Sequence, residues 1–417
     1  MRRHSVVVLL FLLCAVPARA QVPSEATGEV ERLAMPPSPH WAWVADLILN
    51  RIALIDVDGG RFLGMVNGGY GTILPLFPRG RNEFYLPATY YSRGTRGTRT
   101  DVVEFYDGET LAPVGEVVIP PKRATNAVAL AHSALSDDEQ FAAVFNWTTG
   151  TSLSIVDVVQ RRFAGEITLP GCSLVYAAGP RRFFSICADG SLFTVSLNAD
   201  GSEAARTVSA PVFDPRTDPL TEKAVRFGDQ WLFVSFASLV HPIDVSGSEL
   251  VAGEPWPLVP AAERAEHWRI GGLQHLAVHE ASGRLYALMH RGGPDTHKEP
   301  GEEVWIYDIA TRQRLLRVPL VNPGLTVYGF PVTFGQAWPA PFNGLGDWLI
   351  DQLVPAAVGF VQVTQDDAPL LLTASQFTGA IGVYDGRTGA FVRRVLPTGW
   401  TSDILLAPYG RPARSGG

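Results

Sequence analysis

The chain has 417 residues, of which 46% are hydrophobic and 18% are charged, and its net charge at pH 7 is −7. This apolar content is sufficient for one large folded core. The acidic balance argues against binding to nucleic acid or to an anionic membrane surface.

The first 20 residues have the pattern of a secretory signal peptide. Two arginines precede an apolar run at residues 6–16, and residues 18–20 (Ala-Arg-Ala) match the small-x-small cleavage site. We expect export and cleavage after Ala20, and the apolar run is too short for a membrane span. Removing the three arginines of this segment moves the net charge from −7 to −10. Residues 21–37 are polar and contain prolines, which predicts a flexible N-terminal arm.

From residue 52 onwards a short pattern recurs: an alternating apolar run ending in Asp, a polar or glycine-containing turn, and a second alternating run. Strong copies occupy residues 52–66, 103–117, 153–167, 304–318 and 381–395, and weaker ones residues 192–197 and 241–244. Each copy predicts a β-hairpin whose Asp caps the turn. Seven hairpins at near-regular spacing indicate a repeat architecture.

Each hairpin follows a short apolar or aromatic run, and several also follow a weaker candidate strand. These weaker candidates lie at residues 72–76, 127–132, 273–279 and 360–364. Four antiparallel strands per unit and seven units predict an all-β, seven-bladed propeller over residues 38–410. A β-sandwich array is the alternative, but it does not require seven equivalent units. Residues 404–407 form an apolar strand without a blade of its own, and we expect this C-terminal strand to close the ring.

Two cysteines, Cys172 and Cys187, remain after the signal peptide is removed. In an exported protein an even pair predicts a disulfide, with two buried thiols as the alternative. We expect the bond to join the last strand of the third blade to the second strand of the fourth. The chain has no nucleophile elbow, zinc-protease motif, haem-attachment motif or phosphate loop. We therefore predict no catalytic, cofactor-binding or metal-binding residue in this chain.

An insert at residues 321–359 separates the last two hairpins, whose closing Asp308 and Asp385 are 77 positions apart. It is rich in Pro, Gly and aromatic residues and contains one short helix candidate at residues 347–357. The strand count places the insert on the same rim as residues 93–101 and 291–303.

We expect this rim to meet a partner or to shield a channel mouth, with two tryptophans of the insert as apolar anchors. The segment at residues 93–101 (RGTRGTRTD) is basic and glycine-rich, which fits either an anion site or a solvated loop. The candidate partner or channel face comprises Tyr70, Arg93, Arg96, Arg99, Asp101, His297, Trp338 and Trp348.

Several stretches resemble the heavy subunit of the quinoprotein amine dehydrogenases, the methylamine and aromatic amine dehydrogenases. The likeness lies in the cysteine pair and in residues 60–70, 91–113, 262–272, 296–298 and 367–371, which follow the family order and cover most of residues 38–410.

This resemblance implies a periplasmic assembly of two heavy and two light subunits that oxidises primary amines to aldehyde and ammonia. The cofactor, tryptophan tryptophylquinone, is expected on the light subunit, and electrons are expected to pass to a small copper protein or a cytochrome. The heavy chain would provide a docking face and part of the substrate channel. Residues 44–48 lack the aromatic that lines this channel in the methylamine enzymes, so the amine is left open. The alternative function is a free-standing exported propeller that binds a small molecule or a protein.

Overall fold

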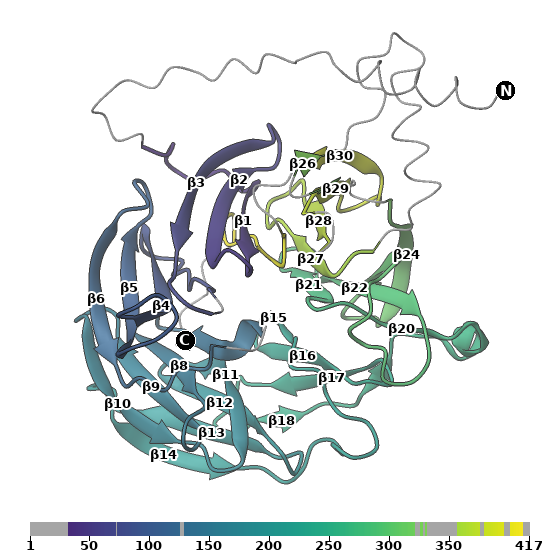
Figure 1. The fold of residues 1–417 in the computed structure, drawn as a ribbon. Coiled ribbons are helices and arrows are strands. Elements are labelled where there is room, and N and C mark those ends of the chain that lie inside the picture. The colour runs from purple at the N-terminus through teal and green to yellow at the C-terminus, as the bar shows by residue number, and fades with distance from the viewer. Residues whose placement is uncertain are drawn as a thin grey trace, which may run out of the picture. The chain divides into compact units, whose positions relative to one another are not determined.

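The computed structural model describes residues 32–71, 73–125, 129–321, 326–327, 330–331, 357–375, 379–395 and 401–411. The chain divides into two compact units, Met1–Arg32 and Leu33–Gly417, and the second contains every described strand. Within that unit, seven antiparallel sheets are arranged in a ring (Figure 1). The predicted seven-bladed β-propeller is confirmed.

The first four blades follow the chain in order, and blade one takes its innermost strand from the C-terminus. From the innermost strand outwards, blade one contains β31 (Ile404–Leu406), β1 (Trp41–Asp46), β2 (Arg51–Asp56) and β3 (Arg61–Asn67). Blade two contains β4 (Glu83–Tyr91), β5 (Arg99–Asp107) and β6 (Pro113–Ile119). Blade three contains β7 (Ser133–Leu135), β8 (Phe141–Asn146), β9 (Ser152–Asp157) and β10 (Arg162–Thr168), preceded by the 3-10 turn η1 (Leu130–His132). Blade four contains β11 (Cys172–Gly179), β12 (Arg182–Cys187), β13 (Leu192–Leu197) and β14 (Glu203–Val208).

The remaining blades show more local variation at their edges. Blade five contains β15 (Val225–Phe227), β16 (Gln230–Val234), β17 (Leu239–Asp244) and β18 (Val251–Ala252), and β19 (Trp256–Pro257) also pairs with β17. Blade six begins after η2 (Ala261–Glu266) and contains β20 (Trp268–Ile270) and β21 (Leu276–His279), both paired with β22 (Arg284–Arg291), then β23 (Glu303–Asp308) and β24 (Gln313–Pro319). Blade seven contains β27 (Phe360–Val363), β28 (Leu370–Ala374), β29 (Ile381–Asp385) and β30 (Phe391–Val395). The insert contributes the short pair β25 (Thr326–Val327) and β26 (Phe330–Pro331).

The ring is closed by the C-terminal strand, as the sequence predicts. Strand β31 pairs antiparallel with β1, with Ile404 opposite Ala45 and Leu406 opposite Trp43. Ile404 and Leu405 are buried. The closure therefore covers an edge of blade one that would otherwise be open to water or to another chain.

The aspartates that end the repeats cap the hairpin turns, again as predicted. The side chain of Asp107 accepts the backbone N–H groups of Glu109 and Thr110 at 3.1 and 2.8 Å. Asp157, Asp308 and Asp385 accept turn N–H groups in the same way. This local bond satisfies the turn backbone and explains why the same Asp recurs at the end of the third strand.

Two innermost strands differ from the prediction. In blade two, residues 72–76 contribute only an isolated antiparallel bridge between Leu76 and Tyr85. In blade three, β7 begins at Ser133, later than the predicted strand at residues 127–132. Innermost strands converge on the propeller axis and pair with a neighbour on one side only, so few of their residues join a ladder. Short segments of this kind carry little periodic signal in the sequence.

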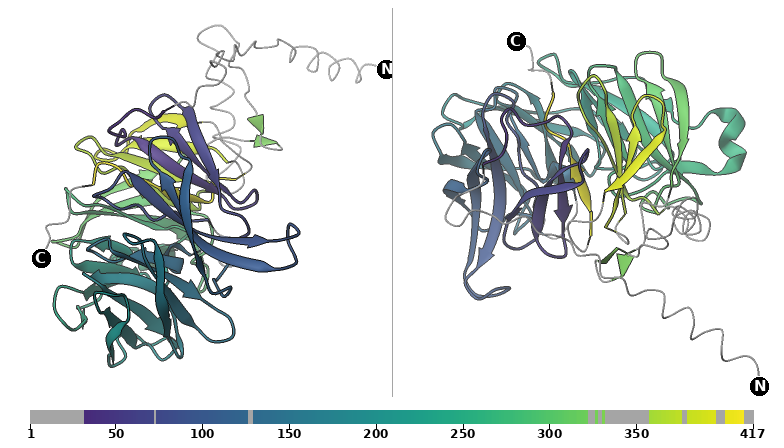
Figure 2. Two further views of the ribbon diagram at one scale, coloured as in Figure 1. Left: turned by 90° about the vertical axis from the view of Figure 1, so that its left-hand side faces the viewer. Right: turned by 90° about the horizontal axis from the view of Figure 1, so that it is seen from above.

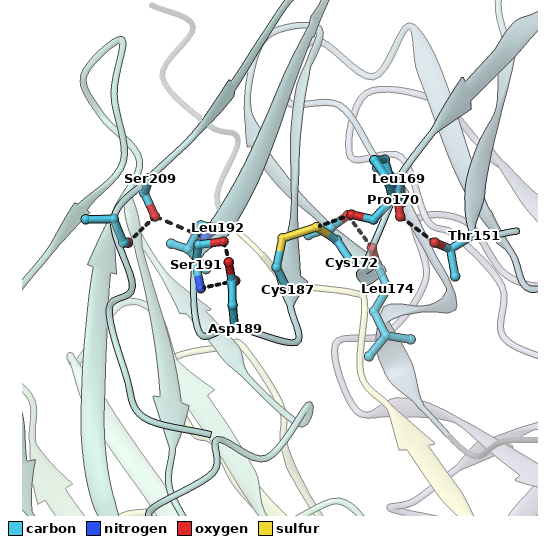
Figure 3. The surroundings of a disulfide bond; sticks show 12 residues. Thr151, Leu169, Pro170, Cys172, Leu174, Cys187, Asp189, Ser191, Leu192 and Ser209 are labelled. Atoms are coloured by element: carbon cyan, nitrogen blue, oxygen red, sulfur yellow. Dashed lines mark hydrogen bonds between the residues drawn. A yellow bond between two sulfur atoms is a disulfide. The ribbon is translucent and has the colours of Figure 1, made fainter. Parts of the chain in front are cut away.

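The Cys172–Cys187 disulfide is present, but its predicted position was wrong. Both cysteines belong to blade four, where they face each other across the adjacent strands β11 and β12 (Figure 3). Cys172 begins the innermost strand of that blade and does not end blade three, because β10 already stops at Thr168. The bond therefore reinforces a hairpin within one blade and does not link two blades.

The described end of the predicted N-terminal arm is anchored to the propeller. The N–H of Leu33 donates to the carbonyl oxygen of Glu109 at 2.9 Å, and its side chain packs against the core of blade one. Leu33, within the segment predicted to be a flexible arm, thus contacts the propeller. The apolar side chain of Leu33 accounts for the contact, since its packing removes apolar surface from water.

Candidate functional site

The links between second and third strands lie on the same propeller face as the links that join one blade to the next, because successive strands alternate in direction. The structure brings two of the predicted segments together on this face. Gly301, in the β22–β23 link, exchanges backbone hydrogen bonds with Val358 at the end of the insert, at 2.6 and 3.3 Å. The N–H of Gly272 donates to the carbonyl oxygen of Glu299, in the same link, at 2.7 Å.

The β4–β5 hairpin, called the arm from here on and distinct from the N-terminal segment at residues 21–37, carries the basic segment. It extends beyond the body of the propeller, where it is blue in Figure 2. Its base is held by the buried carboxylate of Asp101, which accepts two bonds from the guanidinium of Arg99 at 2.9 and 2.8 Å. Asp101 also accepts the hydroxyl of Thr89 and the backbone N–H of Arg123. Two of the predicted site residues, Arg99 and Asp101, therefore position the arm and are not available as a pair to a ligand.

Arg123, which the sequence analysis did not single out, connects this base to the neighbouring link. Its guanidinium is buried and donates to Thr89 at 3.0 Å and to the carbonyl oxygen of Tyr70 at 3.1 Å. Burial lowers the pKa of Arg123 to about 10, so it remains charged at neutral pH. A lone arginine outside any motif gives no sequence signal for such a role.

The tip of the arm exposes its cationic side chains. Arg93 and Arg96 lie in the turn between β4 and β5, where the N–H of Arg93 donates to the carbonyl oxygen of Arg96 at 2.9 Å. Both residues are exposed. At the base, the exposed ring of Tyr70 meets the ring of Tyr91 edge-on at 5.5 Å. The arm thus carries two exposed arginines at its tip and a pair of aromatic rings where it joins the propeller.

Three exposed apolar residues that the sequence analysis missed lie beside this arm. Trp147 is 56% exposed, and its backbone N–H donates to the carbonyl oxygen of Lys122, the residue before Arg123. Ile48 and Leu49 are 60% and 41% exposed in the β1–β2 turn. That turn reaches the Tyr70 link through the hydrogen bond from the N–H of Gly71 to the Asn50 side chain at 3.3 Å.

We call this surface the arm surface; it comprises Ile48, Leu49, Tyr70, Arg93, Arg96 and Trp147. It spans blades one to three on one face. A tryptophan at the end of a predicted strand, followed by a Thr-Thr-Gly turn, is the sequence signal that would have located its aromatic centre. Exposed apolar residues gathered on one face of a protein are typical of an interaction site.

His297 lies apart from the arm surface, in the β22–β23 link. Its ring stacks on Phe236 with 3.6 Å between centroids, and its Nδ1 atom is buried without a hydrogen-bond partner among the described residues. Burial and the charges of Lys223 and Lys298 lower the pKa of His297, which keeps the ring neutral at pH 7. The two other predicted site residues, Trp338 and Trp348, lie outside the described residues, as does most of the insert.

The described residues contain no cluster of three or more His, Cys, Asp or Glu side chains placed to hold a metal ion. In the same part of the chain, no helix has the length and apolar character needed to cross a membrane. One tryptophan pair tests whether a tryptophan-derived quinone fits this chain. Trp268 and Trp305 are 5.2 Å apart, but both are buried, and the guanidinium of Arg317 lies over each ring. A substrate has no access to this pair.

The profile of the methylamine dehydrogenase heavy chain family matches residues 42–333. The methylamine dehydrogenase heavy chain of Paracoccus versutus is 25% identical over 356 residues, covering 84% of this chain and 74% of that protein. The heavy chain of Methylorubrum extorquens is 25% identical over 371 residues, covering 86% and 79% respectively.

Two solved structures support the fold alone. Dihydro-heme d1 dehydrogenase NirN, in complex with DHE, has a TM-score of 0.50 at 16% identity and covers 91% of this chain and 67% of that chain. A functionally unknown protein from Desulfotomaculum acetoxidans has a TM-score of 0.52 at 10% identity, covering 88% and 98%. With its fold, its disulfide and the family match over most of its length, the chain belongs to the methylamine dehydrogenase heavy chain family.

Proposed function

We propose that this chain is the non-cofactor subunit of a periplasmic amine dehydrogenase that oxidises a primary amine to aldehyde and ammonia. The observation that carries the proposal is the family match over residues 42–333. A heavy chain implies a light-chain partner, and we propose an assembly of two heavy and two light subunits. Tryptophan tryptophylquinone, on the light subunit, would accept the electrons of the amine. A small copper protein or a cytochrome would then receive them.

The described residues of this chain support a scaffolding role. The tryptophan pair at Trp268 and Trp305 is buried under guanidinium groups, which fits a cofactor located on another subunit. The arm surface provides what a protein partner requires: an exposed tryptophan and tyrosine with adjacent apolar side chains, flanked by two arginines. We therefore propose that the arm surface contacts the light subunit.

The activity is tested by expressing this chain alone and together with the small, cysteine-rich exported protein expected from a neighbouring gene. The chain alone should show no quinone absorbance and should not oxidise primary amines. The co-expressed complex should show quinone absorbance, should oxidise primary amines and should elute as a larger species. Amine oxidation by the isolated chain would contradict the proposal. A chain that never forms a complex would favour a free-standing binding propeller.

The docking surface is tested by replacing Trp147 with Ala and measuring the affinity for the light subunit. Loss of a central aromatic contact should cost about 2 kcal/mol, or about thirtyfold in Kd. Phe62→Ala is the matched control, because Phe62 is 53% exposed on the outermost strand β3, away from the arm. Equal effects of the two substitutions would show that Trp147 has no specific role.

The arginines of the arm are tested separately, through the rate of association. The double substitution Arg93→Glu and Arg96→Glu should slow association about tenfold at low salt, and the difference should shrink as salt is added. Arg312→Glu is the control, because Arg312 is exposed in the β23–β24 turn on the opposite face. An unchanged association rate in the double variant would remove the arm from the interface.

A further inference from the structure

A cavity of about 510 Å³ lies on the propeller axis, on the face opposite the arm surface. Its walls come from the innermost strands and the first–second strand links of blades two to five, and from Leu406, Ala407, Pro408 and Arg411 near the C-terminus. This volume is within the range of small-molecule sites in proteins. The function proposed above does not use this cavity.

Two ion pairs cross the axis near the mouth of the cavity. Arg79, from blade two, pairs with Glu280 of blade six at 2.9 Å. Arg226, from blade five, makes two bonds to Asp137 of blade three, at 2.7 and 2.8 Å. Neither pair joins adjacent blades, and one member of each, Arg79 and Asp137, lines the cavity with its charge neutralised by its partner. Arg411 also lines the cavity, where Glu280 provides a nearby negative charge.

The carboxylate of Glu222, in the cavity wall, has an oxygen available to a ligand. Oε1 of Glu222 accepts the ammonium of Lys223 at 2.6 Å, while Oε2 makes no hydrogen bond in the described part of the chain. Burial raises the pKa of Glu222, but the charge and hydrogen bond of Lys223 outweigh it, and the pKa lies below its ordinary value. Glu222 is therefore ionised at neutral pH and presents an acceptor to the cavity.

Aromatic rings and a second carboxylate adjoin this acceptor. Tyr176 and Trp231 line the cavity with their rings 5.1 Å apart, and the hydroxyl of Tyr176 donates to the backbone of Glu222 at 2.8 Å. Phe77 also lines the cavity. The carboxylate of Glu139 accepts the backbone N–H groups of Arg79 and Gly80, which are uncharged donors.

We propose that this cavity binds a small organic ammonium ion, whose nitrogen donates to Oε2 of Glu222 and whose apolar part lies against Tyr176 and Trp231. An ammonium gains both a charge-assisted hydrogen bond and attraction to the ring faces. A neutral ligand of the same shape gains neither in full, and a carboxylate meets the charges of Glu222 and Glu139. The site is independent of the light subunit, since every group that forms it belongs to this chain.

The test is isothermal titration of the purified full chain with four matched probes: benzylammonium, benzyltrimethylammonium, benzyl alcohol and phenylacetate. Benzylammonium should bind at least about tenfold more tightly than benzyl alcohol, because the alcohol lacks the charge. Benzyltrimethylammonium should bind with intermediate affinity, because it keeps the charge but has no N–H to donate. Equal affinity for the alcohol, or preference for phenylacetate, would overturn the proposal.

Two variants locate the site. Glu222→Gln combined with Lys223→Met removes the carboxylate charge without leaving a buried ammonium unpaired, and it should weaken benzylammonium binding about tenfold. Ala134→Leu fills the cavity while leaving the ion pair intact, and it should weaken all probes together. Glu249→Gln, at an exposed position outside the cavity, is the control. Unchanged binding in both variants would place the ligand elsewhere, whatever the outcome of the amine oxidation experiments.

Discussion

The side-chain amide of Gln274 makes two hydrogen bonds to the backbone of Leu405, 131 residues further along the chain. Its Nε2 donates to the carbonyl oxygen of Leu405 at 2.8 Å, and its Oε1 accepts the N–H of Leu405 at 2.9 Å. Gln274 is buried and precedes β21 of blade six, while Leu405 lies in the closing strand β31 of blade one. The amide thus takes the place of a neighbouring strand on the axial edge of β31.

We expect Gln274→Ala to destabilise the closure. The substitution leaves the buried N–H of Leu405 without a partner, while Gln362 still donates to its carbonyl oxygen at 3.2 Å. The free energy of unfolding should fall by about 2 kcal/mol, as measured by urea denaturation. Gln313→Ala on the exposed face of β24 should change it by about 0.5 kcal/mol or less. Equal stability of the Gln274 variant would mean that water replaces the amide without cost.

Removing residues 401–417 should have a larger effect, because it removes β31 itself. The burial of Ile404 and Leu405 would be lost, at about 1.5–3 kcal/mol for each side chain, and the edge of β1 would be exposed. We expect a markedly lower Tm and self-association, measured by calorimetry and light scattering. Deleting only residues 412–417 retains β31 and should leave both unchanged. A monomeric truncated protein with the Tm of the full chain would contradict this role for the closing strand.

The sequence predicted those parts of the fold that depend on local pattern. The alternating runs and the Asp-capped turns, such as the one at Asp107, recur because each hairpin satisfies its own backbone groups. The closing strand was predictable because an apolar run at residues 404–407 had no blade of its own. Predicting these features requires only the residues next to each other in the chain or a count of the repeats.

The remaining features depend on side chains that meet across the axis or between blades. Neither the Gln274–Leu405 bond nor the Arg79–Glu280 pair joins segments that any sequence period relates. The disulfide was correctly paired but misplaced, since the boundary between blades three and four lies in the short segment after Thr168. At the candidate site, the arm was predicted from its basic composition, whereas Trp147 belonged to a run interpreted only as a strand.

The disulfide should contribute measurably to stability. Cys172 and Cys187 close a loop with a sequence separation of 15, which corresponds to about 3 kcal/mol in the chain-entropy treatment. The double substitution Cys172→Ala and Cys187→Ala should lower the free energy of unfolding by about that amount. Thiol titration of the denatured mature protein should detect no free thiol before reduction and two afterwards. Two free thiols without reductant would show that the cysteines are not bonded.

The last prediction concerns the pH dependence of stability and the buried side chain of His132, which ends η1 beside the axial cavity. His132 is 5% exposed, and its pKa is lowered to about 4, mainly by burial and then by the charge of Arg123. The unfolded chain has an ordinary histidine pKa of about 6.5. Between these two values the unfolded chain binds a proton that the folded protein does not bind. The free energy of unfolding should therefore fall as the pH is lowered from about 6.5 to about 4, by about 3 kcal/mol in total.

The measurement is urea denaturation of the wild type and of His132→Gln at pH 7, 5.5 and 4.5. The variant cannot titrate at this position, so its curve should be flatter over that interval, even if its stability at pH 7 is lower. His275 is also buried with a lowered pKa, but it contributes equally to both proteins and cancels in the difference. His267→Asn, at an exposed left-handed position that tolerates Asn, should keep the wild-type slope. If His132→Gln also keeps that slope, the acid sensitivity of the propeller arises from other groups.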